Sequence, residues 1–184
     1  DVRSASRRVV LLGATGTIGR ATLDRLRARG HGVVCLVRPG SGAHLPGPSG
    51  CEVREVDFAD TASSADDGLR GERFDAVISC MASRTGAPQD AWAIDHAAHV
   101  RVLEAVTAAG VPHFVLLSAI CVQKPRLEFQ RAKLAFERAL RDSGLRWSIV
   151  RATGFFKSIS GQVARMLAGK PYLLFGDGRL NACA

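Results

Sequence analysis

Hydrophobic residues in this chain follow two patterns that alternate along its length. Short continuous apolar runs, such as Val9-Val10-Leu11-Leu12, are typical of buried parallel strands, whereas apolar residues that recur every three or four positions predict amphipathic helices. The continuous runs predict strands at 8–13, 32–38, 51–56, 74–80, 113–118 and 146–151. The periodic segments predict helices at 17–29, 89–109 and 128–143, and a weaker helix at 60–70.

This alternation of strands and helices predicts an α/β fold. We expect a Rossmann-type, doubly wound and mostly parallel sheet with helices on both faces. Gly30, Gly110 and Gly144 each stand just after a predicted helix, where glycine commonly forms the C-terminal cap. The segment 39–50 is rich in Gly, Pro and Ser and is expected to be a loop.

A glycine-rich turn joins the first predicted strand to the first predicted helix. Its first two glycines let the backbone approach a pyrophosphate, the third allows helix and strand to pack closely, and the helix N-terminus points N–H groups at the phosphates. Three glycines alone are a weak signal, but strand, turn and helix occur here in the order that a dinucleotide site needs. The predicted cofactor-binding residues of this turn are Gly13, Thr15, Gly16, Thr17, Ile18 and Gly19.

Arg38 stands at the end of the second predicted strand, where nucleotide-binding folds meet the adenosine ribose. An acidic residue there would bind the 2′-hydroxyl of NAD, whereas an arginine offers charge and paired donors to the 2′-phosphate of NADP. Arg38 therefore favours NADPH as the cofactor. The alternative is that it is one of many surface arginines.

Residues at the carboxyl ends of the other strands are further candidates, because ligands of such sheets bind at that edge. Asp57-Phe58 follow the third predicted strand and are expected to bind and cover the adenine. Cys80-Met81-Ala82 follow the fourth and are expected to run along the cofactor. Ser118 ends the fifth, where its hydroxyl can face the nicotinamide or the substrate. Ordinary strand-to-helix turns are the alternative for these positions.

Phe129 and Lys133 lie one turn apart on the helix predicted at 128–143. Short-chain dehydrogenases place a catalytic tyrosine and a lysine at this spacing. We expect Lys133 to hold the nicotinamide ribose hydroxyls, whereas Phe129 cannot donate a proton. A solvated helix lysine is the alternative, but lysine occurs only at positions 124, 133, 157 and 170, which favours a role.

Charge and composition mainly exclude other classes of protein. The net charge of +8 comes from arginines scattered through 184 residues, without a basic run or an aromatic-rich stripe, which argues against nucleic acid as a partner. No segment approaches the roughly 20 apolar residues of a membrane span, which leaves only peripheral membrane contact open. His96 and His99 are expected to be ordinary helix residues, because no cysteine or carboxylate arrangement completes a metal site.

The five cysteines form no C-x-x-C pair. Cys35, Cys80 and Cys121 lie in or beside predicted core strands. We therefore expect buried free thiols and a reducing compartment.

Residues 114–133 closely resemble the divinyl chlorophyllide 8-vinyl reductases of chlorophyll and bacteriochlorophyll synthesis, above all in the run Ala119-Ile120-Cys121-Val122-Gln123-Lys124-Pro125. The likeness covers nearly the whole chain. It continues in Met81-Ala82-Ser83-Arg84-Thr85-Gly86, Ser148-Ile149-Val150-Arg151, Phe155-Phe156-Lys157-Ser158, Gly161-Gln162-Val163, Gly169-Lys170-Pro171-Tyr172 and Phe175-Gly176-Asp177-Gly178. Those enzymes are NmrA-like, atypical members of the short-chain dehydrogenase superfamily.

The resemblance implies NADPH-dependent reduction of the 8-vinyl group of a divinyl chlorophyllide or protochlorophyllide to ethyl. It implies a chlorophyllide-type tetrapyrrole as the substrate, Lys133 and Ser118 as catalytic residues, and Phe155 beside the cofactor. Residues 1–154 are then expected to form the NADP-binding domain, and residues 155–184 the start of a truncated substrate-binding lobe. The family usually has proline where Ala152 stands, which leaves the following turn less rigid. The expected location is the bacterial cytoplasm, or the plastid if the source is a phototrophic eukaryote.

Phe129 is compatible with this chemistry, because hydride addition to a conjugated vinyl group spreads negative charge over the macrocycle and needs no positioned phenol. Lys124, Arg126 and Lys157 flank the expected substrate side and are candidates to pair with a propionate. Two alternatives stay open. One is a non-catalytic NADP(H)-binding, NmrA-like regulator or assembly factor, and the other is a related reductase of another conjugated substrate, such as a quinone or a flavin.

Overall fold

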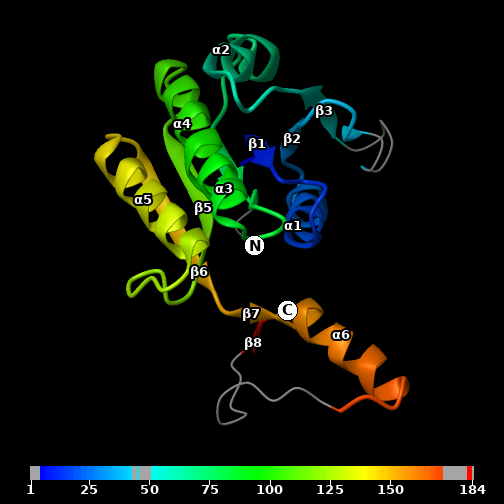
Figure 1. Ribbon diagram of the computed structural model, residues 1–184. Helices are drawn as coiled ribbons and strands as arrows, with labels where there is room; N and C mark the ends of the chain where they lie inside the picture. The colour runs from blue at the N-terminus through cyan, green and yellow to red at the C-terminus, as the bar shows by residue number, and fades with distance from the viewer. Residues whose placement is uncertain (1–4, 43–44, 46–50, 172–181, 184) are drawn as a thin grey trace.

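Six parallel strands form one sheet in the computed structural model, which describes residues 5–42, 45, 51–171 and 182–183. The strands are β1 (Arg8–Leu12), β2 (Gly32–Val37), β3 (Glu52–Glu55), β4 (Ala76–Ser79), β5 (His113–Ala119) and β6 (Arg146–Ala152). Their order is β3-β2-β1-β4-β5-β6, so the chain winds outward in both directions from β1 (Figure 1). The predicted doubly wound parallel sheet is confirmed.

Helices lie on both sides of this sheet, as predicted, with α1 on one side and α4 and α5 on the other (Figure 1). The helical segments are α1 (Thr17–Ala28), α2 (Thr61–Ser63), η2 (Ser64–Leu69), α3 (Pro88–Asp90), η3 (Ala91–Ala98), α4 (His99–Ala108) and α5 (Glu128–Asp142). The helix predicted at 89–109 is therefore one continuous helical stretch, but its middle segment, η3, is π-helical. The weaker helix predicted at 60–70 is also present, and its second part, η2, is π-helical.

The core consists of two apolar layers because successive strand residues point to opposite faces of the sheet. Val10 and Leu12 belong to the larger layer, which includes Phe136 of α5. Leu11 points the other way and packs in the layer that includes Leu23 of α1. The continuous apolar runs in the sequence follow from this burial on both faces.

Glycines end three of the helices as predicted. Gly30, Gly110 and Gly144 have φ values of +76°, +68° and +77°, the left-handed conformation in which glycine avoids a Cβ clash. Of the loop predicted at 39–50, residues 39–42 and 45 are described and form neither a strand nor an α-helix. None of the described helices combines the length and apolar character that crossing a membrane requires.

The described cysteines form no disulfide. Cys35 is buried and Cys80 is half-buried, as expected for thiols in or beside core strands. Cys121 is exposed, so the prediction of a buried thiol is wrong there. Strand β5 ends at Ala119, and Cys121 lies in the following turn with φ +68°, clear of the core.

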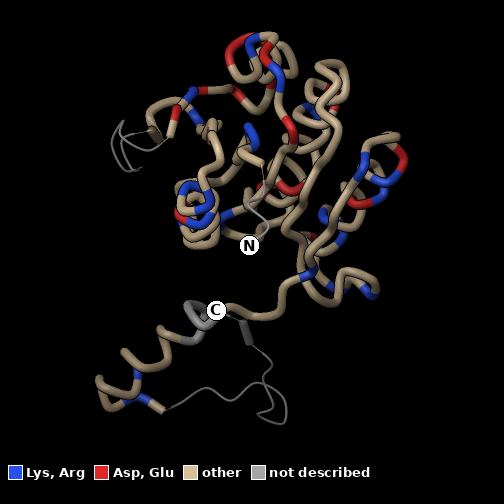
Figure 2. Tube along the Cα trace, turned by 180° about the vertical axis from the view of Figure 1, so that it is seen from behind, with Lys and Arg blue, Asp and Glu red and all other residues tan. Residues whose placement is uncertain are grey.

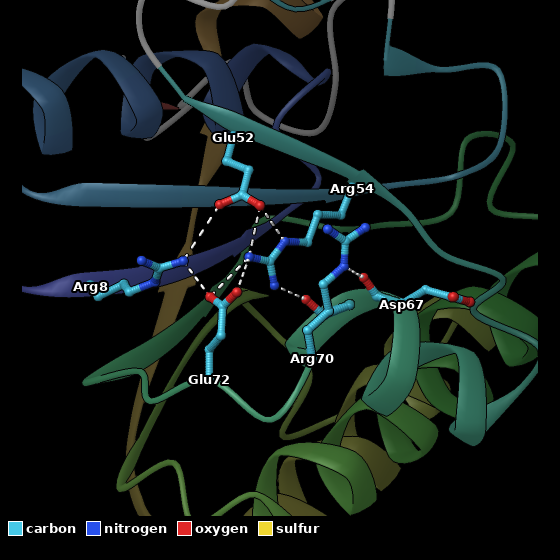
Figure 3. A network of polar contacts seen from close by, with 7 residues as sticks. Arg8, Glu52, Arg54, Asp67, Arg70 and Glu72 are labelled. Carbon is cyan, nitrogen blue, oxygen red and sulfur yellow. Dashed lines mark hydrogen bonds and ion pairs between the residues drawn. The ribbon is translucent and has the colours of Figure 1, made fainter.

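An ion-pair network joins the strands at the amino end of the sheet (Figure 3). The buried side chain of Arg54 donates to Glu52 at 2.8 Å, to Glu72 at 2.9 Å and to the carbonyl oxygen of Gly68 at 2.6 Å. Arg8, the first residue of β1, pairs with the same two carboxylates. Because the network ties β1, β3 and the end of η2 together at the far end from the glycine turn, it supports the fold and not a ligand.

The C-terminal part forms β7 (Gly154–Phe155), α6 (Phe156–Leu167) and β8 (Ala182–Cys183), and β7 pairs in parallel with β8. Figure 1 shows these elements set apart from the six-stranded sheet. The strand and turn expected at 173–178 lie outside the described residues. The division of the chain after residue 154 stays a prediction.

Candidate cofactor site

A cavity of about 550 Å³ lies at the carboxyl ends of β1, β2 and β4. The turn after β1, the end of β2 and the segment after β4 form its walls. Its lining residues are Gly13, Ala14, Thr15, Gly16, Arg20, Leu36, Val37, Arg38, Ser41, Phe58, Cys80, Met81, Ala82, Arg84, Asp90 and Ile94. This is the edge at which doubly wound sheets bind their ligands.

The glycine turn needs its glycines for two different reasons. Gly13 has φ +75°, and a Cβ there would stand 2.6 Å from the backbone of Cys80 and Met81, so the turn after β1 and the end of β4 touch directly. A Cβ on Gly19 would overlap the backbone of Gly13 and Ala14, which keeps α1 close to the turn. The turn is therefore a backbone cradle beside the cavity.

The N-terminus of α1 begins at this cradle. Gly16 is the N-cap residue, so no side chain caps the helix, and its first turn contains no acidic residue. Gly16 also donates a hydrogen bond to the carbonyl oxygen of Gly13 at 3.0 Å, which closes the turn. The helix end thus combines backbone donors with a positive dipole, an arrangement that suits phosphate.

Most of the predicted cofactor-binding residues line the cavity, namely Gly13, Thr15, Gly16, Arg38, Phe58, Cys80, Met81 and Ala82. Thr17, Ile18 and Gly19 form the first turn of α1 behind them. The Asp57 carboxylate accepts a hydrogen bond from the N–H of Ala59 at 2.8 Å and so closes the turn after β3. Asp57, Ser118, Lys133 and Phe155 are not among the lining residues.

Three arginines, Arg20, Arg38 and Arg84, give the cavity a positive lining. Asp90 is the acidic residue beside them. It accepts hydrogen bonds from Thr85 N–H and Oγ1 and from Arg84 N–H, at 2.8–3.0 Å. These hydrogen bonds, first those of Thr85, together with the nearby charge of Arg38, hold the pKa of Asp90 below its ordinary value. Asp90 is therefore ionised, and its carboxylate holds the backbone of residues 84–85 after β4 in place.

Over the six-stranded sheet and its helices, basic residues are interspersed with acidic ones, whereas the described C-terminal part carries basic residues without acidic ones (Figure 2). The last turn of α1, for example, holds Arg25 and Arg27, and Asp24 precedes them. At the cavity, the positive charge comes from three arginines on separate segments that the fold brings together.

A chain of hydrogen bonds connects the cavity wall to the π-helical segment. The N–H of Met81 donates to Ser79 Oγ at 3.3 Å, and Ser79 Oγ lies 2.7 Å from Nε2 of His99. Nδ1 of His99 lies 2.7 Å from the carbonyl oxygen of Ile94, which can only accept. Nδ1 therefore carries the proton, and Nε2 accepts from the Ser79 hydroxyl.

His99 is neutral in this arrangement. Burial, followed by the charge of Lys133, lowers its pKa to about 4. Since both ring nitrogens are engaged with protein groups, His99 belongs to the packing between β4 and α5, where its ring lies 4.8 Å from that of Phe136. His96 instead stacks edge-on with Trp92, and the described residues contain no group of three His, Cys, Asp or Glu side chains that could hold a metal.

Lys133 is held in a buried ion pair with Asp95. Its ammonium nitrogen lies 2.9 Å from Asp95 Oδ1, and the side chains of Lys133 and Asp95 are 10% and 0% exposed. The carboxylate also accepts the N–H of Ser83, at 3.3 and 3.4 Å to its two oxygens. Lys133 is therefore not a solvated helix lysine.

Ser118 donates its hydroxyl proton to Glu137 Oε1 at 2.7 Å. Arg151 of β6 donates to both oxygens of the same buried carboxylate, at 3.0 and 2.5 Å. Burial opposes ionisation of Glu137, but these hydrogen bonds hold its pKa below the ordinary value. The Ser118 oxygen therefore has its proton engaged and can act on a ligand only as an acceptor.

The sequence alone did not identify Asp95, Glu137, Ser79, Asp90, Arg20 or Arg84 as site residues. Arg20 directly follows the last glycine of the turn, and that position was an available signal. Ser79, Asp95 and Glu137 carry no local signal, because each has a partner in another element: His99, Lys133 and Ser118. Asp90 bonds to Thr85 and Arg84 nearby in the sequence, but no pattern there shows that this segment lines a cavity.

Comparison with known proteins agrees with this geometry. A family model described as NAD(P)H-binding matches residues 13–174. Over 190 residues the chain is 45% identical to the chloroplastic divinyl chlorophyllide a 8-vinyl-reductase of Oryza sativa subsp. indica, an alignment that covers 95% of this chain and 46% of that protein. The chain is also 29% identical over 166 residues to the photosystem II assembly factor Ycf39 of Synechocystis, covering 85% of this chain and 48% of the relative.

Among solved structures, the Bordetella bronchiseptica enzyme WbmH in complex with NAD⁺ matches with a TM-score of 0.77 and 21% identity, covering 90% of this chain and 64% of that one. This likeness shows the fold. The chain spans about half the length of the curated relatives it matches. Because the family model extends from Gly13 of the glycine turn to position 174, the chain belongs to the NAD(P)H-binding family.

Proposed function

We propose that the protein carrying this chain uses NADPH to reduce the 8-vinyl group of a divinyl chlorophyllide or protochlorophyllide to ethyl. The observation that carries the proposal is the 45% identity to an 8-vinyl-reductase across 95% of the chain. The assembly factor Ycf39 shares 29% identity over 85% of it, which makes a non-catalytic NADP(H)-binding role the second candidate. The plant reductase is chloroplastic, which supports a plastid location if the source is a phototrophic eukaryote. In a phototrophic bacterium the corresponding location is the cytoplasm.

The residues at the cavity fit NADPH. The glycine cradle and the N-terminus of α1 suit the pyrophosphate, and a side chain at Gly13 would collide with the end of β4. Arg38 directly follows β2 and lines the cavity, where its guanidinium suits a 2′-phosphate. The neighbouring carboxylate of Glu55 on β3 accepts the N–H of Gly40 at 2.9 Å and is not among the lining residues of the cavity. Arg20 and Arg84 add positive charge to the lining.

NADPH supplies a hydride, and the protein supplies binding and orientation. Lys133, with its charge buried beside Asp95, is assigned to the nicotinamide ribose hydroxyls. Phe129 replaces the phenol of a carbonyl-reducing site, in keeping with a reaction that spreads its charge over a macrocycle. Ser118 contributes as an acceptor, because its proton is donated to Glu137. Catalysis then rests mainly on positioning the two reactants, with the proton drawn from water or a residue of the substrate lobe.

Absorption spectroscopy tests the proposal. The protein is incubated with a divinyl chlorophyllide and NADPH, and the Soret band is followed. The proposal predicts a blue shift toward the monovinyl spectrum that requires NADPH. An unchanged Soret band with tight NADPH binding would favour the non-catalytic alternative, and reduction of a quinone or flavin in place of the pigment would favour the related reductase.

A further inference from the structure

We propose that Asp95 is the positioning residue of the cofactor site: it fixes the Lys133 ammonium for the nicotinamide ribose and joins it to the cavity wall after β4. The inference rests on the proposed role of Lys133. No local sequence pattern points to Asp95, because it lies in η3 and acts across an interface with α5.

Burial fixes the geometry of the ion pair between Lys133 and Asp95. The Asp95 carboxylate is 0% exposed and lies 2.9 Å from the lysine nitrogen, so the Lys133 stem is held at its charged end and not only along its methylenes. In the described part of the chain, Asp95 is the carboxylate within ion-pair distance of Lys133. Glu137, one turn further along α5, is engaged by Arg151 and Ser118 instead.

The ammonium keeps donors for a ligand. A lysine ammonium has three N–H donors, and the ion pair with Asp95 uses one of them. The hydroxyl oxygens of a ribose are acceptors that can take the remaining donors. A lysine fixed in this way meets the cofactor with its rotamer already selected, which lowers the entropic cost of binding.

Asp95 also bonds to the protein on its other side. Its two oxygens accept the N–H of Ser83 at 3.3 and 3.4 Å, and the residues just before Ser83, Met81 and Ala82, line the cavity. The Asp95 carboxylate therefore positions both the Lys133 ammonium and the backbone after β4 along which the cofactor is expected to run. A change at Asp95 should disturb the nicotinamide half of the site more than the adenosine half.

Fragment binding separates this role from a structural one. We compare the dissociation constants of NADPH and of adenosine 2′,5′-bisphosphate, which lacks the nicotinamide ribose, for wild type and Asp95→Asn. The expected result is an increase of about tenfold for NADPH, in the range of couplings between contacting residues, with the bisphosphate unchanged. An equal loss for both ligands, or no loss for NADPH, would overturn the proposal.

If Asp95→Asn alone fails to fold, because it leaves the Lys133 charge buried without a partner, a double variant that removes both charges takes its place. If Asp95 acts through Lys133, the double variant Asp95→Asn/Lys133→Gln binds NADPH no more weakly than Lys133→Gln, whereas independent roles would multiply the two losses. Glu128→Gln is the matched control. Glu128 also links α5 to η3, through Trp92 Nε1 at 2.9 Å, but at the surface, so NADPH binding should not change.

The outcomes distinguish this inference from the proposed function. If wild type binds NADPH and reduces the pigment while Asp95→Asn binds NADPH normally, only the positioning role fails. If wild type does not bind NADPH, the cofactor assignment fails and the role of Asp95 fails with it.

Discussion

The Ser118 hydroxyl and the Glu137 carboxylate form a buried hydrogen bond of 2.7 Å between the end of β5 and the middle of α5. Arg151 of β6 completes the cluster by donating to both carboxylate oxygens. The carboxylate of Glu137 on α5 thus connects this helix to β5 through Ser118 and to the edge strand β6 through Arg151. Ser118 is in this respect part of the scaffold that supports the expected nicotinamide end of the site.

This arrangement predicts unequal costs for removing its members. Ser118→Ala loses one hydrogen bond to a charged acceptor and should lower the free energy of unfolding by about 1.5 kcal/mol. Glu137→Gln removes the charge that Arg151 faces in a buried setting and should cost about 3 kcal/mol. Urea denaturation measures both values. A larger loss for Ser118→Ala than for Glu137→Gln would contradict the central place of the carboxylate.

The glycine turn offers a test of steric contact against backbone strain. Gly13 and Gly30 have nearly equal φ values, +75° and +76°, but a Cβ on Gly13 would stand 2.6 Å from the β4 end whereas one on Gly30 meets nothing within 4 Å. Gly30→Ala should therefore cost only the left-handed penalty of about 1–2 kcal/mol. Gly13→Ala should cost more and also weaken NADPH binding, as thermal unfolding and a binding titration would show. Equal losses in the two variants would mean that the contact with Cys80 and Met81 does not matter.

Burial of His99 predicts a pH dependence of stability. Its pKa falls from 6.5 to about 4 on folding. Between these values the unfolded chain binds a proton that the folded chain does not, so stability present above pH 6.5 is lost as the pH falls toward 4, by about 3 kcal/mol in total. The charged or titratable groups that act on the ring are Lys133 of α5 and Asp95 and His96 of η3.

The control for this pH dependence is His99→Gln, which removes the titrating group and keeps a polar side chain near Ser79. Urea denaturation at several pH values should give a shallower slope for the variant between pH 4 and 6.5. Parallel slopes in the two proteins would show that another group carries the dependence.

Cofactor choice is predicted to depend on Arg38. Arg38→Gln removes a charged donor from the expected 2′-phosphate site and should raise the dissociation constant of NADPH by about 10- to 100-fold, the equivalent of a charge-assisted hydrogen bond. NADH binding should not change, because it has no 2′-phosphate. Arg138→Gln, at an exposed position on α5, is the matched charge control. If both variants lose the same affinity, the effect is general electrostatic attraction and not recognition of the phosphate.

The strands and the glycine turn after β1 were predictable because local patterns determine them. Each predicted strand lies within two residues of the observed one at either end, since burial on both faces produces an apolar run that stands out from its neighbours. The glycine turn was predictable for a similar reason, because close backbone contacts require glycines, and these stand within a few consecutive residues of the sequence. The position of Arg38 at the cavity was predictable because it directly follows a strand, whereas its role toward a 2′-phosphate stays a prediction.

The polar cluster around Lys133 was not predictable from such patterns. Asp95 and Lys133 are far apart in the sequence, and neither position shows that the two charges pair inside the protein. Glu137 lies among the charged residues of α5 and looks like a solvated one until its partners on β5 and β6 are known. The π-helical turns of η2 and η3 were missed because their apolar spacing resembles that of an α-helix.

Isotope transfer tests the central claim, NADPH-dependent reduction of the vinyl group, most directly. The protein is incubated with a divinyl chlorophyllide and NADPH carrying deuterium at both C4 positions, and the pigment is analysed by mass spectrometry and NMR. The account predicts a monovinyl product with one deuterium from NADPH in the new 8-ethyl group, and a second when the reaction is run in D₂O. An ethyl group without deuterium from NADPH, or a vinyl group left intact by a protein that binds NADPH, would contradict it.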